Sequence, residues 1–251
     1  MRELSMSEPE FINSDLERTF FRILVVVPAF NEERALPELL RELIPVVKRL
    51  HADILVVNDH SRDRTGDVAH SFPSVMALHL PCNLGIGGAV QAGFKFACKN
   101  GYEALIQVDG DGQHLPSEIE KLLTPIFRGE SDVALGSRFL EKGGWRSTKT
   151  RQLGIRIFRW TNQILLRQKI TDSTSGFRAY NRRAIDFFAD YYPTDYPEPE
   201  AVVMLCRAGF RLKEIPVRMV ERQGGRSSIT AGKSFYYMVK VLLAVCIRAL
   251  S

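Results

Sequence analysis

Short aliphatic runs alternate with helical patterns along the first half of the chain. The first run, Arg22-Ile-Leu-Val-Val-Val-Pro28, is almost continuously aliphatic and ends at a proline, as a buried parallel strand does. Further strands are predicted at 53–58, 74–80, 104–108 and 132–135, and helices at 32–50, 67–72, 86–99 and 116–128. This alternation indicates an α/β fold with a doubly wound, mostly parallel sheet that carries helices on both faces.

The second half of the chain is less regular. A basic amphipathic helix is predicted at 151–167, a turn leading into a strand at 172–180, and a helix at 198–208. A strand follows at 211–220, where Pro216 favours an edge position because proline cannot donate to a ladder. Residues 223–228 form a predicted glycine-rich loop, and a last amphipathic helix is expected in the 231–251 segment.

Composition narrows the class of protein. The 251 residues are 45% hydrophobic and 25% charged, which suits one large α/β domain or two small domains. The four cysteines are far apart and form no CxxC pair, so we expect a reducing cytosol rather than a disulfide scaffold or zinc knuckle. No signal peptide or apolar run of spanning length is predicted. Neither a P-loop nor a GxGxxG run after the first strand is present.

The charge is unevenly distributed. The chain carries +5 overall, yet residues 138–183 hold twelve basic and two acidic residues, which leaves the remainder at −5. A strongly basic segment suggests a polyanion or a membrane surface as partner. A nucleic-acid partner is not expected, because no RNA- or DNA-binding motif is recognisable.

Polar clusters follow three of the predicted strands, at 28–33, 58–63 and 109–114. Ligands of open parallel sheets bind beyond the carboxyl ends of the strands, so these clusters predict a site on one rim. Asp109 and Asp111, with Gln113 beyond them, offer the oxygen ligands that Mg²⁺ or Mn²⁺ prefers, although Asp-Gly also favours a simple turn. Asp59 is placed to bind a nucleotide or, alternatively, to cap the following helix.

Five motifs together resemble those of a known family. They are Val27-Pro-Ala-Phe-Asn-Glu-Glu33, Val57-Asn-Asp-His-Ser-Arg-Asp-Arg-Thr65, Asp109-Gly-Asp-Gly-Gln113, Gly136-Ser-Arg138 and Asp172-Ser-Thr-Ser-Gly-Phe-Arg178. In this order and spacing they resemble family-2 glycosyltransferases of the Rossmann-like GT-A fold, nearest to dolichyl-phosphate mannose synthases and bacterial polyprenyl-phosphate hexose synthases. The resemblance implies a tail over 1–19, a GT-A domain over 20–230 and a C-terminal helix over 231–251.

The resemblance also implies a role for each candidate residue. The nucleotide-sugar would be bound by Pro28, Ala29, Asn31, Glu32, Asp59 and Asp109, with Arg222 and Arg226 closing over its diphosphate. Mg²⁺ or Mn²⁺ would be held by Asp109, Asp111 and Gln113. The acceptor phosphate would be bound by Arg138 and Arg151, and Glu198 and Glu200 lie where relatives carry an acceptor-side acid. The alternative interpretations are that the arginines are solvated surface residues and that Glu200 is an acid in the first turn of a helix.

The activity implied is transfer of one hexose, with inversion, from a UDP- or GDP-sugar to a polyprenyl phosphate. A phosphate acceptor is already ionised and needs no general base, whereas a hydroxyl acceptor would need one, such as Glu200 or Asp172. A hydroxyl acceptor and a non-catalytic nucleotide-sugar-binding protein are the alternatives. The two amphipathic helices favour a peripheral position at the cytoplasmic face of the membrane, or contact with a membrane partner protein or a second copy of the chain.

Overall fold

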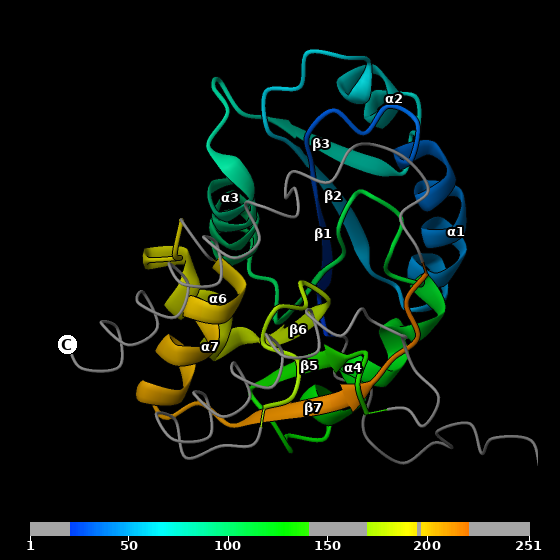
Figure 1. The fold of residues 1–251 in the computed structure, drawn as a ribbon. Coiled ribbons are helices and arrows are strands. Elements are labelled where there is room, and N and C mark those ends of the chain that lie inside the picture. The colour runs from blue at the N-terminus through cyan, green and yellow to red at the C-terminus, as the bar shows by residue number, and fades with distance from the viewer. Residues whose placement is uncertain (1–20, 141–169, 195–196, 221–251) are drawn as a thin grey trace, which may run out of the picture.

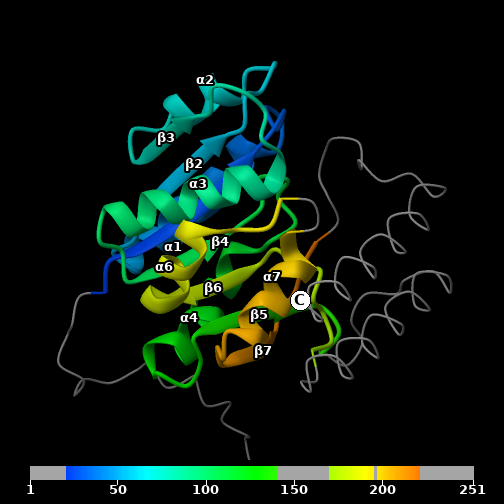
Figure 2. The same cartoon turned by 90° about the vertical axis from the view of Figure 1, so that its left-hand side faces the viewer.

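We describe the protein from a computed structural model that defines residues 21–140, 170–194 and 197–220. Its seven-stranded sheet has the order β3-β2-β1-β4-β6-β5-β7 and lies between two layers of helices (Figures 1 and 2). The strands are β1 (Ile23–Ala29), β2 (Asp53–Asn58), β3 (Val75–His79), β4 (Ala104–Gln107), β5 (Val133–Ser137), β6 (Arg178–Asn181) and β7 (Leu212–Pro216). The helices are α1 (Leu36–Arg49), α2 (Thr65–His70), α3 (Gly85–Lys99), the 3₁₀ turn η1 (Pro116–Glu118), α4 (Ile119–Phe127), α6 (Arg182–Asp190) and α7 (Pro197–Arg207).

The sheet is mostly parallel, which confirms the predicted fold class. Strand β1 pairs in parallel with β2 and β4, and β2 pairs in parallel with β3. Strand β6 is the exception, because it runs antiparallel to both β4 and β5. Among the described strands, β7 pairs only with β5 and lies at the edge, as Pro216 predicts, although this proline is the last residue of the strand and not its middle.

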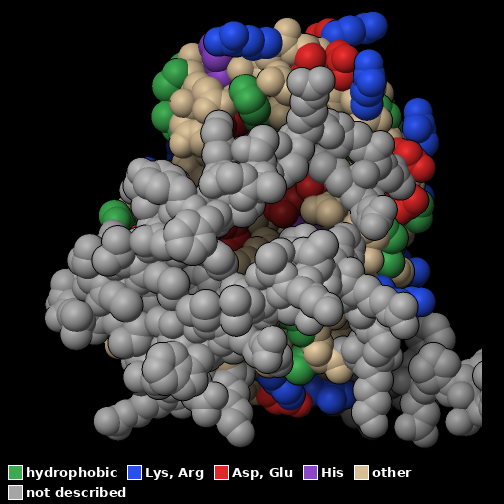
Figure 3. Space-filling view, viewed as in Figure 1, with side chains coloured by type: hydrophobic (Ala, Val, Ile, Leu, Met, Phe, Trp, Pro, Cys, Tyr) green, Lys and Arg blue, Asp and Glu red, His purple; other side chains and the backbone are tan. Residues whose placement is uncertain are grey.

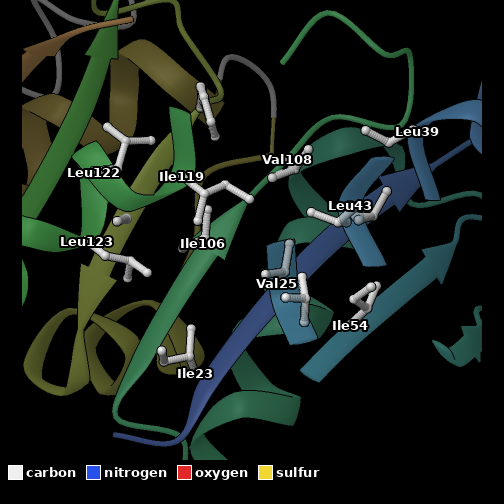
Figure 4. Close-up of a cluster of buried hydrophobic side chains, with 14 of the residues drawn as sticks. Ile23, Val25, Leu39, Leu43, Ile54, Ile106, Val108, Ile119, Leu122 and Leu123 are labelled. Atoms are coloured by element: carbon white, nitrogen blue, oxygen red, sulfur yellow. The ribbon is translucent and has the colours of Figure 1, made fainter. Parts of the chain in front are cut away.

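A hydrophobic core fills each side of the sheet. On one side α1, α2 and α4 pack onto the strands, with Val25, Ile54 and Ile106 among the buried side chains (Figure 4). On the other side α3, α6 and α7 cover the sheet, as Figure 2 shows. Each fully buried aliphatic side chain contributes roughly 1.5–3 kcal/mol. The two cores therefore hold the strand ends in fixed positions and give the rim a rigid base.

Helix α6 was not predicted from the sequence. It has nine residues, begins where Asn181 accepts a hydrogen bond from the Ala184 N–H, and buries Ile185 and Phe188. An asparagine cap followed by apolar residues three or four positions apart is a usable signal for such a short helix. Helix α1 begins later than the predicted residue 32, because the residues before it bind the loop after β2.

Several predicted segments lie outside the described residues. They are the tail over 1–19, the helix at 151–167, the loop at 223–228 and the helix in 231–251. Within the described residues, no helix combines the length and apolar character that a membrane span requires. Cys82, Cys98 and Cys206 are free thiols, and Cys246 lies outside the described residues.

Candidate active site

The order of the strands brings the three predicted polar clusters to one rim. Strand β1 lies between β2 and β4, so the chain leaves all three strands at neighbouring points. The Gly110 N–H donates to the Pro28 carbonyl at 3.2 Å, and the Asp59 N–H donates to the Ala29 carbonyl at 3.0 Å. The buried residues Pro28 and Ala29 thus join the other two clusters through their backbone. This confirms that the clusters meet at the carboxyl ends of the strands.

The loops after β1 and β2 are bonded to each other. The Asn31 N–H donates to Ser61 Oγ at 3.0 Å, and Asn31 Oδ1 accepts from the Arg62 N–H at 2.9 Å. The Glu32 N–H donates to Thr65 Oγ1 at 2.8 Å. Asn31 has a left-handed backbone with φ of 56°, which asparagine tolerates better than most residues. These contacts fix two of the motifs as one rigid unit before any ligand binds.

Asp59 is almost fully buried, at 3% exposure, and joins β2 to the start of α3. Its Oδ1 accepts from the Leu84 N–H at 2.7 Å, and its carbonyl accepts from Asn83 Nδ2 at 3.1 Å. Leu84 is the residue before α3, so Asp59 does not cap the helix that directly follows it. Its carboxylate fixes the loop between β3 and α3 at the edge of the site.

Asp109 is held from several directions. Its N–H donates to His114 Nδ1 at 3.0 Å, so the ring proton of the neutral imidazole is on Nε2. This Nε2 atom lies 3.7 Å from Asp109 Oδ2. Gln107 Nε2 donates to Asp109 Oδ1 at 3.3 Å. The His114 ring is buried and stacks on Phe177 with centroids 4.7 Å apart. His114 therefore positions Asp109, a role that its place in the third polar cluster did not reveal.

A glycine makes room for the Asp109 carboxylate. A Cβ on Gly176 would lie 2.8 Å from Asp109 Oδ2 and 3.0 Å from Gln107 Nε2. Real Cβ atoms do not approach other atoms so closely, so a larger residue at this position would displace the carboxylate. The loop before β6 thereby sets the position of an acid that follows β4.

Asp111 and Gln113 form the outer part of this rim. Asp111 Oδ1 accepts from the Gln113 N–H at 3.1 Å, and the Gln113 carbonyl accepts from the Val220 N–H at 3.1 Å. The Asp109 side chain is 31% exposed, and acidic side chains are visible near the middle of the molecule in Figure 3. The described residues contain no group of three His, Cys, Asp or Glu side chains suited to a metal. Carboxylate and amide oxygens of the kind carried by Asp109, Asp111 and Gln113 are the donors that Mg²⁺ or Mn²⁺ prefers.

Arg138 follows β5 and forms a buried ion pair with Asp172. Its Nε and Nη2 donate to the two oxygens of Asp172, each at 2.8 Å, and the Asp172 side chain is fully buried. Burial lowers the pKa of Arg138, but the hydrogen bonds and charge of Asp172, together with the charge of Asp109, outweigh burial and raise it. Because Asp172 is occupied by Arg138, it is poorly suited to act as a general base for a hydroxyl acceptor.

Arg178 connects two segments of this region from within the protein. This fully buried side chain donates to the carbonyls of Ser175, Ser173 and Glu198, at 2.7 to 2.9 Å. It thus links the 172–177 loop to the start of α7. The sequence singled out Arg178 only as the end of a motif, and its burial could not be foreseen from that motif.

Two glutamates lie in the first turn of α7, as predicted for this segment. Glu200 is buried, at 6% exposure. Burial, together with the negative charge of Asp109, raises the pKa of Glu198 to about 7. An acid of α7 therefore interacts with the carboxylate that follows β4. The remaining predicted residues, Arg151, Arg222 and Arg226, lie outside the described residues.

Comparison with known proteins identifies the family. Residues 24–188 match the profile of glycosyl transferase family 2. The chain belongs to this family. It is 34% identical over 222 residues to an undecaprenyl-phosphate mannosyltransferase of Micrococcus luteus, covering 84% of this chain and 88% of that protein. It is also 31% identical over 230 residues to a polyprenol monophosphomannose synthase of Mycolicibacterium smegmatis, covering 88% of this chain and 85% of that protein.

Solved structures place this glycosyltransferase in the GT-A fold. Glucosyl-3-phosphoglycerate synthase from Mycobacterium tuberculosis, in complex with Mn²⁺, UDP and phosphoglyceric acid, aligns with a TM-score of 0.70 at 16% identity. The alignment covers 92% of this chain and 80% of that chain. The same enzyme has also been crystallised with Mg²⁺ and UDP. At this level of identity the likeness concerns the fold, and it agrees with the predicted architecture.

Proposed function

We propose that the protein is a metal-dependent, inverting glycosyltransferase that moves a hexose from a UDP- or GDP-sugar to a polyprenyl phosphate. The observation that carries this proposal is the guanidinium of Arg138. It is held rigidly by a buried carboxylate and interacts with the charge of Asp109. A cation fixed at this point suits an anionic acceptor that must meet the donor beside its diphosphate. Relatives named for undecaprenyl phosphate and polyprenol monophosphomannose support the same acceptor class.

On the donor side, the base and ribose would bind among Pro28, Ala29, Asn31, Glu32 and Asp59. The rigid union of the loops after β1 and β2 supports this role, because a preformed pocket loses little entropy on binding. Asp109, Asp111 and Gln113 would hold Mg²⁺ or Mn²⁺, which would neutralise charge on the departing nucleoside diphosphate. Arg222 and Arg226 would close over the same diphosphate.

On the acceptor side, Arg138 and Arg151 would bind the phosphate, whose oxygen attacks C1 of the hexose without needing a base. A hydroxyl acceptor is the second candidate, and the raised pKa of Glu198 favours it, because a base works best when its pKa lies near the working pH.

We further propose peripheral membrane association at the cytoplasmic face, with the 231–251 segment contacting the membrane, a membrane partner or a second copy. We propose that residues 1–19 form a tail and that residues 20–230 form the catalytic domain.

Acceptor-side variants separate the two candidates. Arg138→Ala and Arg151→Ala should each reduce transfer to polyprenyl phosphate by about 10- to 100-fold, the loss expected for a hydrogen-bonded charge. Glu198→Gln and Glu200→Gln should keep most of the activity. Arg182→Ala is the matched control, since it also removes an ion-paired arginine, but on α6. If the glutamine variants lose activity while the arginine variants keep it, the acceptor is a hydroxyl.

A further inference from the structure

Glu214 of β7 uses both carboxylate oxygens to hold the chain just before the 172–177 loop. Oε2 accepts from the Thr171 N–H at 2.8 Å, whereas Oε1 accepts from the Asp172 N–H at 2.8 Å and from Thr171 Oγ1 at 2.9 Å. These bonds join residues more than forty positions apart. Hydrogen bonds to an ionised acceptor are stronger than those between neutral groups, so the Thr171–Asp172 peptide is firmly fixed.

The end of β5 is attached to the same point. Ser137 Oγ lies 2.8 Å from Thr171 Oγ1, and since the threonine proton is donated to Glu214, the serine must be the donor. Strands β5 and β7 pair in parallel, with Leu135 opposite Glu214, and Arg138 is the first residue after β5. Glu214 therefore joins the segment that carries Asp172 to the strand that presents Arg138.

The contacts continue to the guanidinium of Arg138. Asp172 Oδ2 accepts from both the backbone N–H and the Nε of Arg138, and Thr174 Oγ1 accepts from Nη2 at 3.0 Å. Among the described residues, all side-chain bonds of Arg138 use Nε and Nη2, which leaves Nη1 available. The arginine is thus held by one edge and can bind a phosphate oxygen with the other.

We propose that Glu214 is a positioning residue for the acceptor phosphate, acting through Asp172 on Arg138. The inference rests on the proposed function, because it requires that Arg138 binds an acceptor phosphate. A purely structural role for Glu214, as a brace between β7 and the 171–172 peptide, is the alternative. The two roles differ in whether the effect of Glu214 depends on Arg138.

A double-mutant cycle tests this dependence. Glu214→Ala should raise the KM for undecaprenyl phosphate by about tenfold while the KM for the donor stays within about twofold. In an Arg138→Ala background, the same change should raise the acceptor KM by less than about twofold, because the group that it positions is gone. Glu214→Gln retains the shape of the side chain but loses one oxygen that accepts hydrogen bonds. Its effect on the KM for undecaprenyl phosphate should therefore lie between those of the wild type and Glu214→Ala. Glu130→Ala is the control, since Glu130 also pairs with a β7 residue, Lys213, but lies in an exposed position.

Equal effects in both backgrounds, or an equal rise in donor and acceptor KM, would overturn the inference. If Glu214→Ala does not fold, the cycle with Glu214→Gln decides by the same criterion. A wild-type protein that transfers sugar to no polyprenyl phosphate would refute the proposed function, and the inference with it. If the wild type transfers sugar normally but the effects of the Glu214 and Arg138 substitutions simply add, the positioning role of Glu214 is refuted while the proposed function stands.

Discussion

At the scale of single residues, the site depends on how each charge is held. Asp109 has the Gln107 amide and the His114 ring as neighbours, and it acts electrostatically on Glu198. None of these relations follows from the Asp-Gly-Asp pattern, which predicts two carboxylates and says nothing of their surroundings. The motifs predict the candidate residues Asp109, Asp111 and Arg138, but not the contacts of His114, Gly176 and Glu214, which join separate strands and loops.

Glu198 should make the stability of the metal-free protein depend on pH. Its pKa in the folded protein is raised to about 7 from a usual 4.5, so the stability it contributes is present below the usual pKa and is lost as the pH rises through about 7. Glu198→Gln removes the cost of holding this charge. Relative to the wild type, the variant should therefore gain on the order of 2 kcal/mol in free energy of unfolding between about pH 5 and about pH 8.

Urea denaturation in EDTA measures this difference. Glu120→Gln serves as the comparison, because Glu120 is an exposed partner of Arg49 on the surface. A gap between wild type and Glu198→Gln that stays constant over this pH range would show that the folded protein does not raise the pKa of Glu198.

At the scale of helices and strands, the regular alternation made most of the fold predictable. The five predicted strands of the first half are all present. Strands β1, β2, β4 and β5 are largely buried and read as short apolar runs, whereas β3 is an edge strand that is only partly buried. Helix α6 is hard to predict because it is short and directly follows a strand, so the Asn181 cap is the main signal that marks its start. The antiparallel direction of β6 depends on pairing between distant segments, which local sequence patterns do not encode.

The loop before β6 should control the carboxylate that follows β4. Gly176→Ala would place a Cβ against both oxygens of Asp109, so we expect the carboxylate to shift and the affinity for Mn²⁺ to fall by about tenfold or more. Titration calorimetry with Mn²⁺ and the nucleoside diphosphate measures this affinity. Gly129→Asn is the control, since Gly129 lies in open space with a left-handed φ of 64° that asparagine tolerates. Unchanged Mn²⁺ affinity in Gly176→Ala would remove Asp109 from the proposed metal site.

At the scale of the whole molecule, the basic 138–183 segment divides into two parts. Four of its arginines are described, and each is engaged within the protein: Arg138 with Asp172, Arg178 with backbone carbonyls, Arg182 with Asp186, and Arg183 with Asp132. Arg138 and Arg178 are largely buried, whereas Arg182 and Arg183 form ion pairs at the surface, with side chains 43% and 56% exposed. The polyanion or membrane partner suggested by the charge pattern would therefore depend mainly on the other eight basic residues, which lie at 142–169.

The proposed reaction requires a lipid phosphate as acceptor and a divalent metal. The most direct measurement compares undecaprenyl phosphate with undecaprenol, the same lipid without phosphate, as acceptors of labelled hexose from UDP- and GDP-sugars in the presence of Mn²⁺. We predict a labelled lipid from undecaprenyl phosphate alone, lost on adding EDTA and in Asp111→Asn. Labelling of undecaprenol would show that the acceptor need not carry a phosphate, and transfer that persists in EDTA and in Asp111→Asn would show that no metal at Asp111 takes part.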